Sequence, residues 1–559
     1  MPASGSRFWF WLLLAFTAVT GLWQVTQTEL LPDEAYYWLY AQNLDWGYFD
    51  HPPMVALLIK LSCFLGHSEF GVRAVFLVFS LAALVLVHRV VKPKDELLFT
   101  AVFFSLPLLH LGSGFAAPDI PLVFFGAAFF AAYQRFLAKN DWASVVVLTL
   151  LTTAMLYTKY HTVLVLFFCI AANVNVLTNK KFWVAVIAST ILFLPHVYWQ
   201  WQHGFPSVVY HLSGRNDVPW QLWYTTNYIA GQWLVLGPFI CLPVLYFAMR
   251  TKFDDKWLTA IKWNVIGFLL FFLYNSFRNT VEANWTAPIL IPFAILSYTV
   301  LQHRLLLRKW VVGTAVLSFC VIFLIKAVLI MPAFDEIVTQ RTELKGWKKL
   351  ATAVQQVAGD KPVVFMNSYR MAATYAFYSG GLTTSVNTTA QRGNQFDYWG
   401  YGEQMAGKEV LEITNDWYYS SDPKIATPRI NLSYRWAKNH KSYYRFRVKS
   451  VDNPMCLEGA DSISLNILIE EKFSSKKLLY GYLQTGVPLY FQYAQPKNHR
   501  APMYSGVTIT SNTLNKVLPM KIPAPPLSGT YELYFIAGNA ASELCAVSSS
   551  KIIVKNVIK

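Results

Sequence analysis

Residues 8–331 consist of long apolar segments that are separated by short polar loops. A membrane-spanning helix requires roughly 20 mostly apolar residues, and about eleven segments approach this length. We expect a span near residues 8–28, 70–91, 97–115, 119–137, 143–158, 162–178, 182–200, 222–249, 258–275, 285–302 and 310–331. The first segment is long, lacks a clean small-residue cleavage site and precedes many others, so it predicts a retained helix rather than a signal peptide.

The pattern changes after residue 331. A helical pattern over 344–357, an apolar run over 363–366 and a second helical stretch over 371–378 predict a small α/β domain. Beyond about residue 425, short alternating segments such as 443–448, 464–469 and 531–536 are separated by Gly, Pro and Asn, which is typical of a β-sandwich. The predicted fold is therefore mainly α: a polytopic helical membrane domain over 1–331 with a long first outer loop over 29–69, an α/β domain over 332–424 and a β-rich domain over 425–559.

Charge sharpens this division. Charged residues make up only 14% of the chain and hydrophobic residues 55%, whereas soluble domains are about 25% charged. The net charge of +16 does not indicate nucleic acid, because 26 of the 47 Lys and Arg lie in residues 332–559 and fourteen others share one face of the membrane domain. By the positive-inside rule that face is cytoplasmic. We therefore expect an inner-membrane protein whose N-terminus is cytoplasmic. Because the number of predicted spans is odd, the C-terminal domains are expected on the opposite side, in the periplasm.

The six cysteines indicate no metal site. Cys63, Cys169, Cys241 and Cys320 lie in or beside apolar segments, where they act as small hydrophobes. Cys456 and Cys545 lie in the outer part of the chain, and sequence leaves open whether they pair. No cysteine and histidine spacing is typical of zinc.

The first outer loop contains the densest candidate chemistry. Asp33 and Glu34 follow Pro32 and predict the first turn of a helix, whose Tyr36, Tyr37, Trp38 and Tyr40 favour the membrane interface. These two acids either cap that helix or belong to an active site. Asp50 and His51 follow in the same loop, and Asp119 follows Pro118 at the next outer loop. Several carboxylates are thus expected at one membrane surface.

Outward cations are equally rare. Lys159, beside Tyr160 and His161, is either an anchor at the membrane boundary or a point charge for a phosphate. Arg278 and Glu282 form a structural pair or a second part of the site, Arg215 is a third candidate, and Arg73 holds either an outer carboxylate or a phosphate. Carboxylates, phosphate-binding cations and an aromatic interfacial helix indicate a lipid phosphate substrate. The expected reaction is displacement at the carbon bonded to that phosphate.

Eight sequence blocks between residues 8 and about 400 resemble a known family. They are LPDEAYYW, YFDHPPM, APDIPLVFF, TKYH, LPHVYWQWQHG, VEANW, LKGW and RGNQFDYW. They are similar, in this order, to bacterial GT-C membrane glycosyltransferases related to protein O-mannosyltransferases and the lipid A aminoarabinose transferase. The resemblance implies transfer of a hexosyl or pentosyl group from a polyprenyl-phosphate donor, without a nucleotide cofactor and usually with inversion.

The resemblance also implies roles for individual residues. Asp33 corresponds to the acid that serves as base or orients the acceptor, and Asp119 to the second catalytic acid. Lys159 and Arg278 are expected at the donor phosphate. Further substrate contacts are expected from Glu34, Tyr160, His161, Arg73 and Arg215. The candidate ligands of a divalent metal ion are Glu282, His51 and Asp50.

The acceptor is expected to be a glycolipid such as lipid A, another glycan or a protein on the outer face. A lipid flippase or transporter is the main alternative, although its charges would lie nearer the membrane midplane and its halves would be related. A receptor-like protein with an outer β-domain would not explain the carboxylates at the membrane face.

Overall fold

The computed structural model of the chain divides into two units, Met1–Gly346 and Trp347–Lys559, which are described separately. The structure describes residues 7–212, 220–387, 393–415, 422–440, 446–452, 455–457, 461–471, 486–495, 498–499, 503–525, 529–537 and 552–557. The first unit ends after Gly346, somewhat later than the predicted boundary at residue 331, because α17 and the segment after it remain with the helices.

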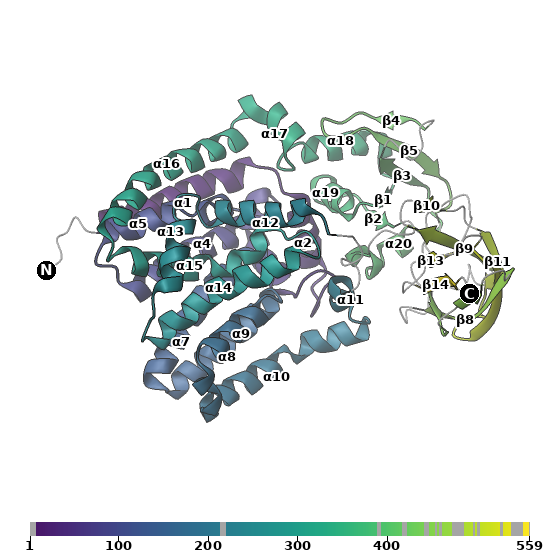
Figure 1. Cartoon of the computed structure of the whole chain (residues 1–559). Coiled ribbons are helices and arrows are strands. Elements are labelled where there is room, and N and C mark those ends of the chain that lie inside the picture. Colours follow the sequence, from purple (N-terminus) through teal and green to yellow (C-terminus); the bar gives the residue numbers. More distant parts are fainter. Residues whose placement is uncertain are drawn as a thin grey trace. The chain divides into compact units, whose positions relative to one another are not determined.

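The first unit is helical (Figure 1). Its α-helices are α1 (Phe8–Gln27), α2 (Pro32–Gln42), α3 (Met54–Ser62), α4 (Glu69–Val91), α5 (Glu96–Phe104), α6 (Pro107–Leu111), α7 (Asp119–Lys139), α8 (Trp142–Thr158), α9 (Thr162–Ala172), α10 (Lys180–Gln202), α11 (Pro206–Leu212), α12 (Leu222–Val235), α13 (Cys241–Arg250), α14 (Lys256–Ser276), α15 (Leu290–Leu301), α16 (Leu305–Ile330) and α17 (Asp335–Arg341). Short 3-10 helices are η1 (Cys63–Leu65), η2 (Val174–Thr178), η3 (Ala283–Ile289) and η4 (Pro332–Phe334).

Polar residues in the loops begin several of these helices. Ser68 accepts a hydrogen bond from the Gly71 amide at the start of α4, over 3.0 Å. Asp141 caps α8 through the Ser144 amide, over 2.8 Å, and Asp255 caps α14 in the same way. Such caps satisfy amide groups that the helix leaves without partners.

Seven helical segments among the described residues are long and apolar enough to cross a membrane. They are α1, α4, α7, α10, η3 with α15, α14 and α16. Shorter apolar helices such as α8, α9 and α13 accompany them, so the predicted total of eleven spans stays a prediction.

Two predicted spans are each divided into two helices. The segment 97–115 is broken between α5 and α6 before Pro107, which has no amide hydrogen to continue a helix. The segment 222–249 is broken between α12 and α13, where Gly237 has a left-handed φ of 88° and Pro238 follows. The sequence pattern detected the apolar length but not these interruptions.

The core of the first unit surrounds α15. Every residue of this helix except Thr299 is buried, which agrees with its apolar character on all sides. The helices around α15 are buried on one face only. Helix α16, for example, leaves Leu306, Val316 and Leu324 exposed. Apolar side chains on outer faces suit contact with lipid, and the unit is that of a multi-pass membrane protein.

A substitution in the turn between α12 and α13 can test how closely these helices pack. A Cβ atom on Gly237 would lie 2.0 Å from the Ser105 carbonyl oxygen, and its φ disfavours any other residue. We expect Gly237→Ala to destabilise the protein by about 1–3 kcal/mol and to lower the midpoint of thermal unfolding in detergent. Gly313→Ala, in open space on α16, is the control, and an unfolding midpoint as high for Gly237→Ala as for this control would contradict the prediction.

The first outer loop folds into α2, α3 and η1. As predicted, a helix begins at Pro32 with Asp33 and Glu34 in its first turn. Its aromatic side chains, however, do not all lie at a lipid surface: Tyr36 and Tyr40 are fully buried, and Tyr40 stacks on Tyr48 with 4.0 Å between ring centroids. The loop therefore folds back onto protein, because its later segment supplies an aromatic partner.

The second unit begins with an α/β layer. Its elements are α18 (Trp347–Ala358), β1 (Val363–Met366), α19 (Tyr369–Ser379), β2 (Thr383–Val386), η5 (Gln395–Asp397), α20 (Tyr401–Gln404), β3 (Val410–Asn415), β4 (Lys424–Ile425) and β5 (Leu432–Ala437). The strands form one sheet in the order β2-β1-β3-β5-β4. Strand β1 is parallel to β2 and β3, whereas β5 is antiparallel to β3 and carries the sheet to Ala437, beyond the predicted boundary at 424.

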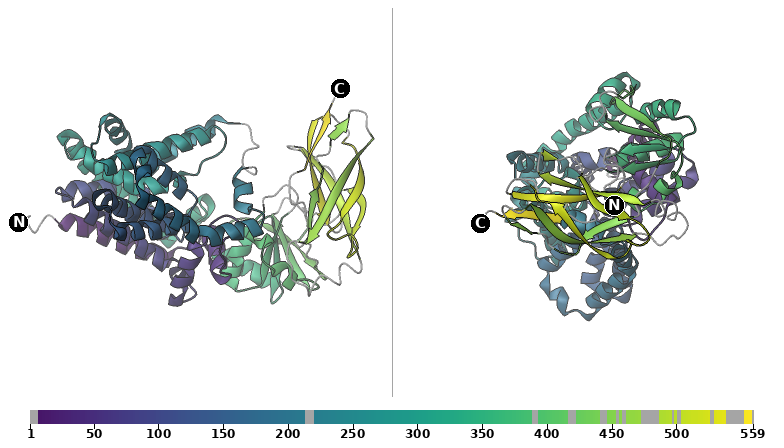
Figure 2. Two further views of the ribbon diagram at one scale, coloured as in Figure 1. Left: turned by 90° about the horizontal axis from the view of Figure 1, so that it is seen from below. Right: turned by 90° about the vertical axis from the view of Figure 1, so that its right-hand side faces the viewer.

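The remaining strands form two further sheets (Figure 2). They are β6 (Phe446–Ser450), β7 (Met455–Leu457), β8 (Ser462–Glu471), β9 (Val487–Gln495), β10 (Asn498–His499), β11 (Met503–Ile509), β12 (Val517–Pro523), β13 (Gly529–Ala537) and β14 (Ile552–Val557). One sheet has the order β10-β9-β13-β14-β7 with β11 on β9, and the other the order β12-β8-β6. Buried residues of both sheets form one core, which is a sandwich arrangement. Cys545 lies outside the described residues, so its pairing with Cys456 stays a prediction.

Candidate functional site

Asp119 is the first residue of α7 and lies at a meeting point of three segments. Its Oδ1 atom is 2.6 Å from the Lys159 ammonium, and its Oδ2 atom accepts a hydrogen bond from the Asn284 amide over 2.9 Å. Both charged residues are almost buried, at 8% and 6% exposure. Segments around residues 119, 159 and 284 are far apart in sequence, and this carboxylate joins them.

Lys159 lies at the extended C-cap of α8, before α9. The sequence left open whether it is an anchor at the membrane boundary or a phosphate ligand. In the structure its ammonium is paired with Asp119. A contact between Lys159 and a donor phosphate stays a prediction, and the structure assigns the lysine first to the neighbouring acid.

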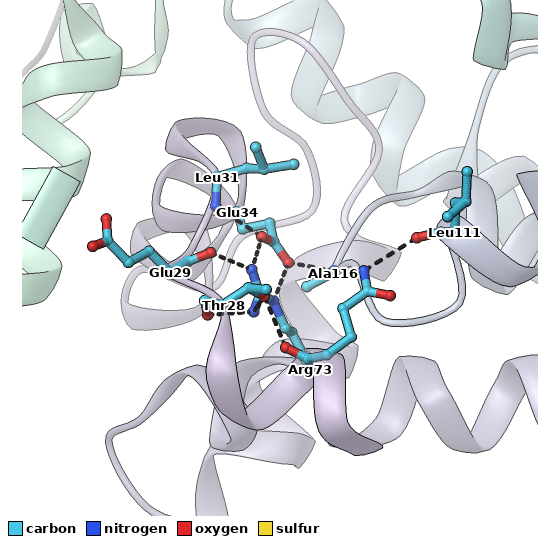
Figure 3. Close-up of polar contacts among 8 residues, drawn as sticks. Thr28, Glu29, Leu31, Glu34, Arg73, Leu111 and Ala116 are labelled. Atoms are coloured by element: carbon cyan, nitrogen blue, oxygen red, sulfur yellow. Dashed lines mark hydrogen bonds and ion pairs between the residues drawn. The ribbon is translucent and has the colours of Figure 1, made fainter. Parts of the chain in front are cut away.

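Glu34 and Arg73 form a second, fully buried ion pair (Figure 3). The Arg73 guanidinium donates to both carboxylate oxygens, over 2.8 and 2.5 Å. It also donates to the carbonyl oxygens of Thr28 and Glu29 and to the Thr28 hydroxyl. Of the two alternatives for Arg73, the structure shows the carboxylate.

This pair corrects the predicted substrate contacts of Glu34 and Arg73. Arg73 has no exposed surface and Glu34 only 2%. The glutamate also accepts hydrogen bonds from the Leu31 amide, over 2.9 Å, and the Ala116 amide, over 2.7 Å. Glu34 therefore caps α2, as the alternative interpretation held, and both side chains are buried against other protein groups.

The same contacts position Asp33. This residue precedes Glu34 in the first turn of α2 and is partly exposed. Because Glu34 holds the Ala116 amide, that turn lies beside the segment that leads through Pro118 to Asp119. The two predicted catalytic acids thus come from neighbouring segments, one accessible and one almost buried.

Asp50 lies beside the buried Tyr40. The Tyr40 hydroxyl donates to Asp50 Oδ2 over 3.4 Å. Burial, followed by the influence of Tyr36 and Asp50, raises the pKa of Tyr40 well above its usual value. Burial also raises the pKa of Tyr160, and the Asp50 charge adds to this. The charge of Asp50 therefore acts on both Tyr40 and Tyr160, whereas the predicted role of Asp50 at a metal ion stays a prediction.

Tyr160 belongs to a hydrogen-bond network that the sequence prediction missed. Its hydroxyl lies 2.9 Å from His196 Nε2 and accepts from the Gln200 amide over 3.2 Å. His196 Nδ1 donates to the Trp46 carbonyl oxygen over 2.8 Å, so Nε2 is the acceptor for the tyrosine. Gln200 also donates to Ser207, whose hydroxyl donates to the Phe49 carbonyl oxygen. His196 and Gln200 were indicated in the sequence only by their place in the block LPHVYWQWQHG.

The other predicted residues are more dispersed. His161 lies in an aromatic environment, with its ring centroid 5.4 Å from Phe272 and 5.9 Å from Trp285. His51 lies 5.4 Å from the Tyr37 ring. These histidines therefore lie against aromatic rings in different segments.

Arg278 and Glu282 are exposed on the segment between α14 and η3. Arg278 stacks on the Tyr274 ring and donates to its hydroxyl over 2.7 Å. No ion pair between Arg278 and Glu282 is found in the part of the chain that the structure describes, which disagrees with the structural-pair alternative. Arg278 thus remains an outward cation, and Arg215 lies outside the described residues.

The predicted metal ligands do not assemble into a cluster. Within the described ranges, no group of three or more His, Cys, Asp or Glu side chains could hold a metal ion. Glu282 lies on the segment before η3, whereas Asp50 and His51 lie in the first outer loop. Metal dependence stays a prediction.

The chain is similar to known glycosyltransferases. Residues 50–199 match a family described as dolichyl-phosphate-mannose-protein mannosyltransferase. Over 325 residues, or 54% of this chain, the sequence is 28% identical to the lipid A galacturonosyltransferase RgtD of Rhizobium johnstonii. This match spans 66% of the length of that relative, slightly less than two thirds.

Solved structures of ArnT from Cupriavidus metallidurans share the fold. The apo structure matches with a TM-score of 0.56 and the structure bound to undecaprenyl phosphate with 0.55. Both are 14% identical, covering 77% of this chain and 98% of ArnT. The predicted resemblance and the GT-C fold are confirmed: the sequence is similar to PMT-like glycosyltransferases, and the fold is shared with ArnT.

Proposed function

We propose that this protein is a membrane glycosyltransferase that transfers a sugar from a polyprenyl phosphate to the glycolipid lipid A on the outer face of the inner membrane. The observation that carries the proposal is that Lys159 and Asn284 both bind Asp119, next to the segment that Glu34 ties to the first turn of α2, in a fold shared with a protein that binds undecaprenyl phosphate. The similarity to a lipid A galacturonosyltransferase favours lipid A over protein or free glycan as the acceptor.

The proposed reaction assigns one step to each of the exposed charged groups of the site. The acceptor hydroxyl oxygen attacks the anomeric carbon of the donor, and the bond from that carbon to the phosphate oxygen breaks. The hydroxyl proton passes to Asp33, which is the accessible acid. The bond electrons leave with the polyprenyl phosphate, whose charge the exposed Arg278 stabilises. Attack opposite the leaving group inverts the anomeric carbon.

Asp119 has a different part in this proposal. Its two oxygens are already bound by Lys159 and Asn284, so it has less capacity to accept the acceptor proton. Its role is to hold the segments of the site together and to keep the buried lysine in place. With the N-terminus cytoplasmic and an odd number of spans, the site and the C-terminal domains face the periplasm.

The proposal is tested with the purified full-length protein in lipid nanodiscs, supplied with an undecaprenyl-phosphate sugar and lipid A. We expect mass spectrometry to show lipid A carrying one added sugar and an equal amount of released undecaprenyl phosphate. Omission of lipid A is the control and should prevent the release.

The comparisons give no support to the flippase or transporter alternative. A transporter would move the donor across a vesicle membrane without any new glycosidic bond. Donor movement in vesicles, together with no sugar on any envelope lipid, glycan or protein, would overturn the proposed function.

A further inference from the structure

Asn284 was not among the predicted site residues, yet it binds an acid of the site. We propose that Asn284 is a positioning residue, which acts through Asp119 and links the late outer segment to the start of α7. This inference rests on the proposed function. It concerns a single contact, the hydrogen bond of 2.9 Å from the side-chain amide of Asn284 to Asp119 Oδ2.

The contact completes the restraint on the carboxylate. Lys159 binds only Oδ1 of Asp119, over 2.6 Å. An ammonium is a point charge without a preferred plane, so the lysine alone would allow the carboxylate to rotate. A second donor on the other oxygen defines the carboxylate plane, and Asn284 supplies that donor.

The backbone beside Asn284 is itself held in place. The Gln232 side chain on α12 donates to the Ala283 carbonyl oxygen over 3.3 Å and accepts from the Thr286 hydroxyl over 2.5 Å. Gln232 and Thr286 are buried, at 5% and 0% exposure. Contacts with α12 on both sides of Asn284 therefore fix the position from which its amide reaches Asp119.

Asn284 also belongs to the segment that carries Arg278 and Glu282. It begins η3 together with Ala283, directly after the exposed Glu282. The Asn284 residue is exposed although its acceptor is almost buried. The contact therefore joins the segment that carries the exposed Arg278 to the almost buried Asp119.

The first variant is Asn284→Leu, which keeps the approximate size of the side chain and removes the donor. We expect kcat for sugar transfer to fall by about 10- to 100-fold, since misplaced catalytic groups cost up to about this factor. The KM for the undecaprenyl-phosphate sugar should change by less than about threefold, because the contact holds the protein rather than the substrate. Asn284→Asp places a second carboxylate next to Asp119 in place of a donor, so its kcat should be at least as low as that of Asn284→Leu.

A double-mutant cycle separates this role from a general structural one. In an Asp119→Asn background, Asn284→Leu should have no further effect on kcat, because its target is already altered. Asn175→Asp, at an exposed position in η2, is the control for the charge change and should transfer sugar like the wild type. Additive losses in the cycle, or wild-type kcat in Asn284→Leu, would overturn the proposal.

The same cycle is measured by thermal unfolding, which does not depend on activity. The unfolding midpoints of the two single variants and the double variant should be non-additive if the side chains bind each other. No transfer by the wild-type protein would overturn the proposed function, and additive midpoints would separately overturn the contact between Asn284 and Asp119.

Discussion

Asp33→Asn is expected to abolish sugar transfer while leaving the protein folded. The change removes the carboxylate that accepts the proton of the attacking hydroxyl and keeps the size of the side chain. General-base catalysis contributes about 10²- to 10⁴-fold, so kcat should fall within this range. Asp33 is partly exposed, whereas Asp119 is almost buried and its two oxygens accept hydrogen bonds from Lys159 and Asn284.

The measurement is the initial rate of lipid A modification by purified protein in nanodiscs, with the unfolding midpoint determined on the same samples. Glu69→Gln provides a matched control, because Glu69 lies in the first turn of α4 and has no role in the proposed reaction. Its rate should remain within about twofold of the wild type, as for a surface change. If Asp33→Asn transferred sugar at the wild-type rate, another group would have to be the base.

Arg73→Met is expected to have the largest effect on stability. It leaves the Glu34 carboxylate buried at 2% exposure without its cation. Removal of one partner from a buried pair costs about 3–5 kcal/mol, whereas replacement of both partners is often much better tolerated. The single variant should therefore have a much lower unfolding midpoint, and Glu34→Gln combined with Arg73→Met should recover part of the loss.

A surface pair provides the comparison for this prediction. Arg135 and Asp141 also form an ion pair, but their side chains are 50% and 34% exposed. Exposed pairs contribute about 0–1 kcal/mol, so Arg135→Met should barely change the unfolding midpoint. Equal effects of Arg73→Met and Arg135→Met would show that the buried pair has no special importance. A large effect of Arg73→Met would instead support its role in holding α1, α2 and α4 together.

Several features of the site could be predicted from single positions in the sequence. Pro32 before Asp33 and Glu34 predicted the start of α2, and the structure begins this helix there. The same is true of Pro118 before Asp119 at the start of α7. These predictions succeeded because a proline at or before the first turn and an acid within it are local signals of a helix start.

Partners across the fold could not be predicted in this way. Arg73 and Glu34 are separated by 39 positions, and Asp119 and Asn284 by 165. Nothing in the neighbourhood of Arg73 distinguishes a carboxylate from a phosphate as its ligand. Asn284 carries no charge and is an ordinary residue for a loop, so the only signal for it was its place in the block VEANW.

The sequence alone determined that this is a membrane protein with C-terminal α/β and β-rich parts, because apolar length, alternation and charge density depend on residue types in order along the chain. It also selected the rare outward acids and cations. Only the tertiary structure decided that Glu34 and Arg73 form a buried support, that Lys159 is held by Asp119 and that Asp33 remains accessible. The physical reason is that the role of a charge depends on its burial and on the nearest opposite charge, and both are set by contacts between distant segments.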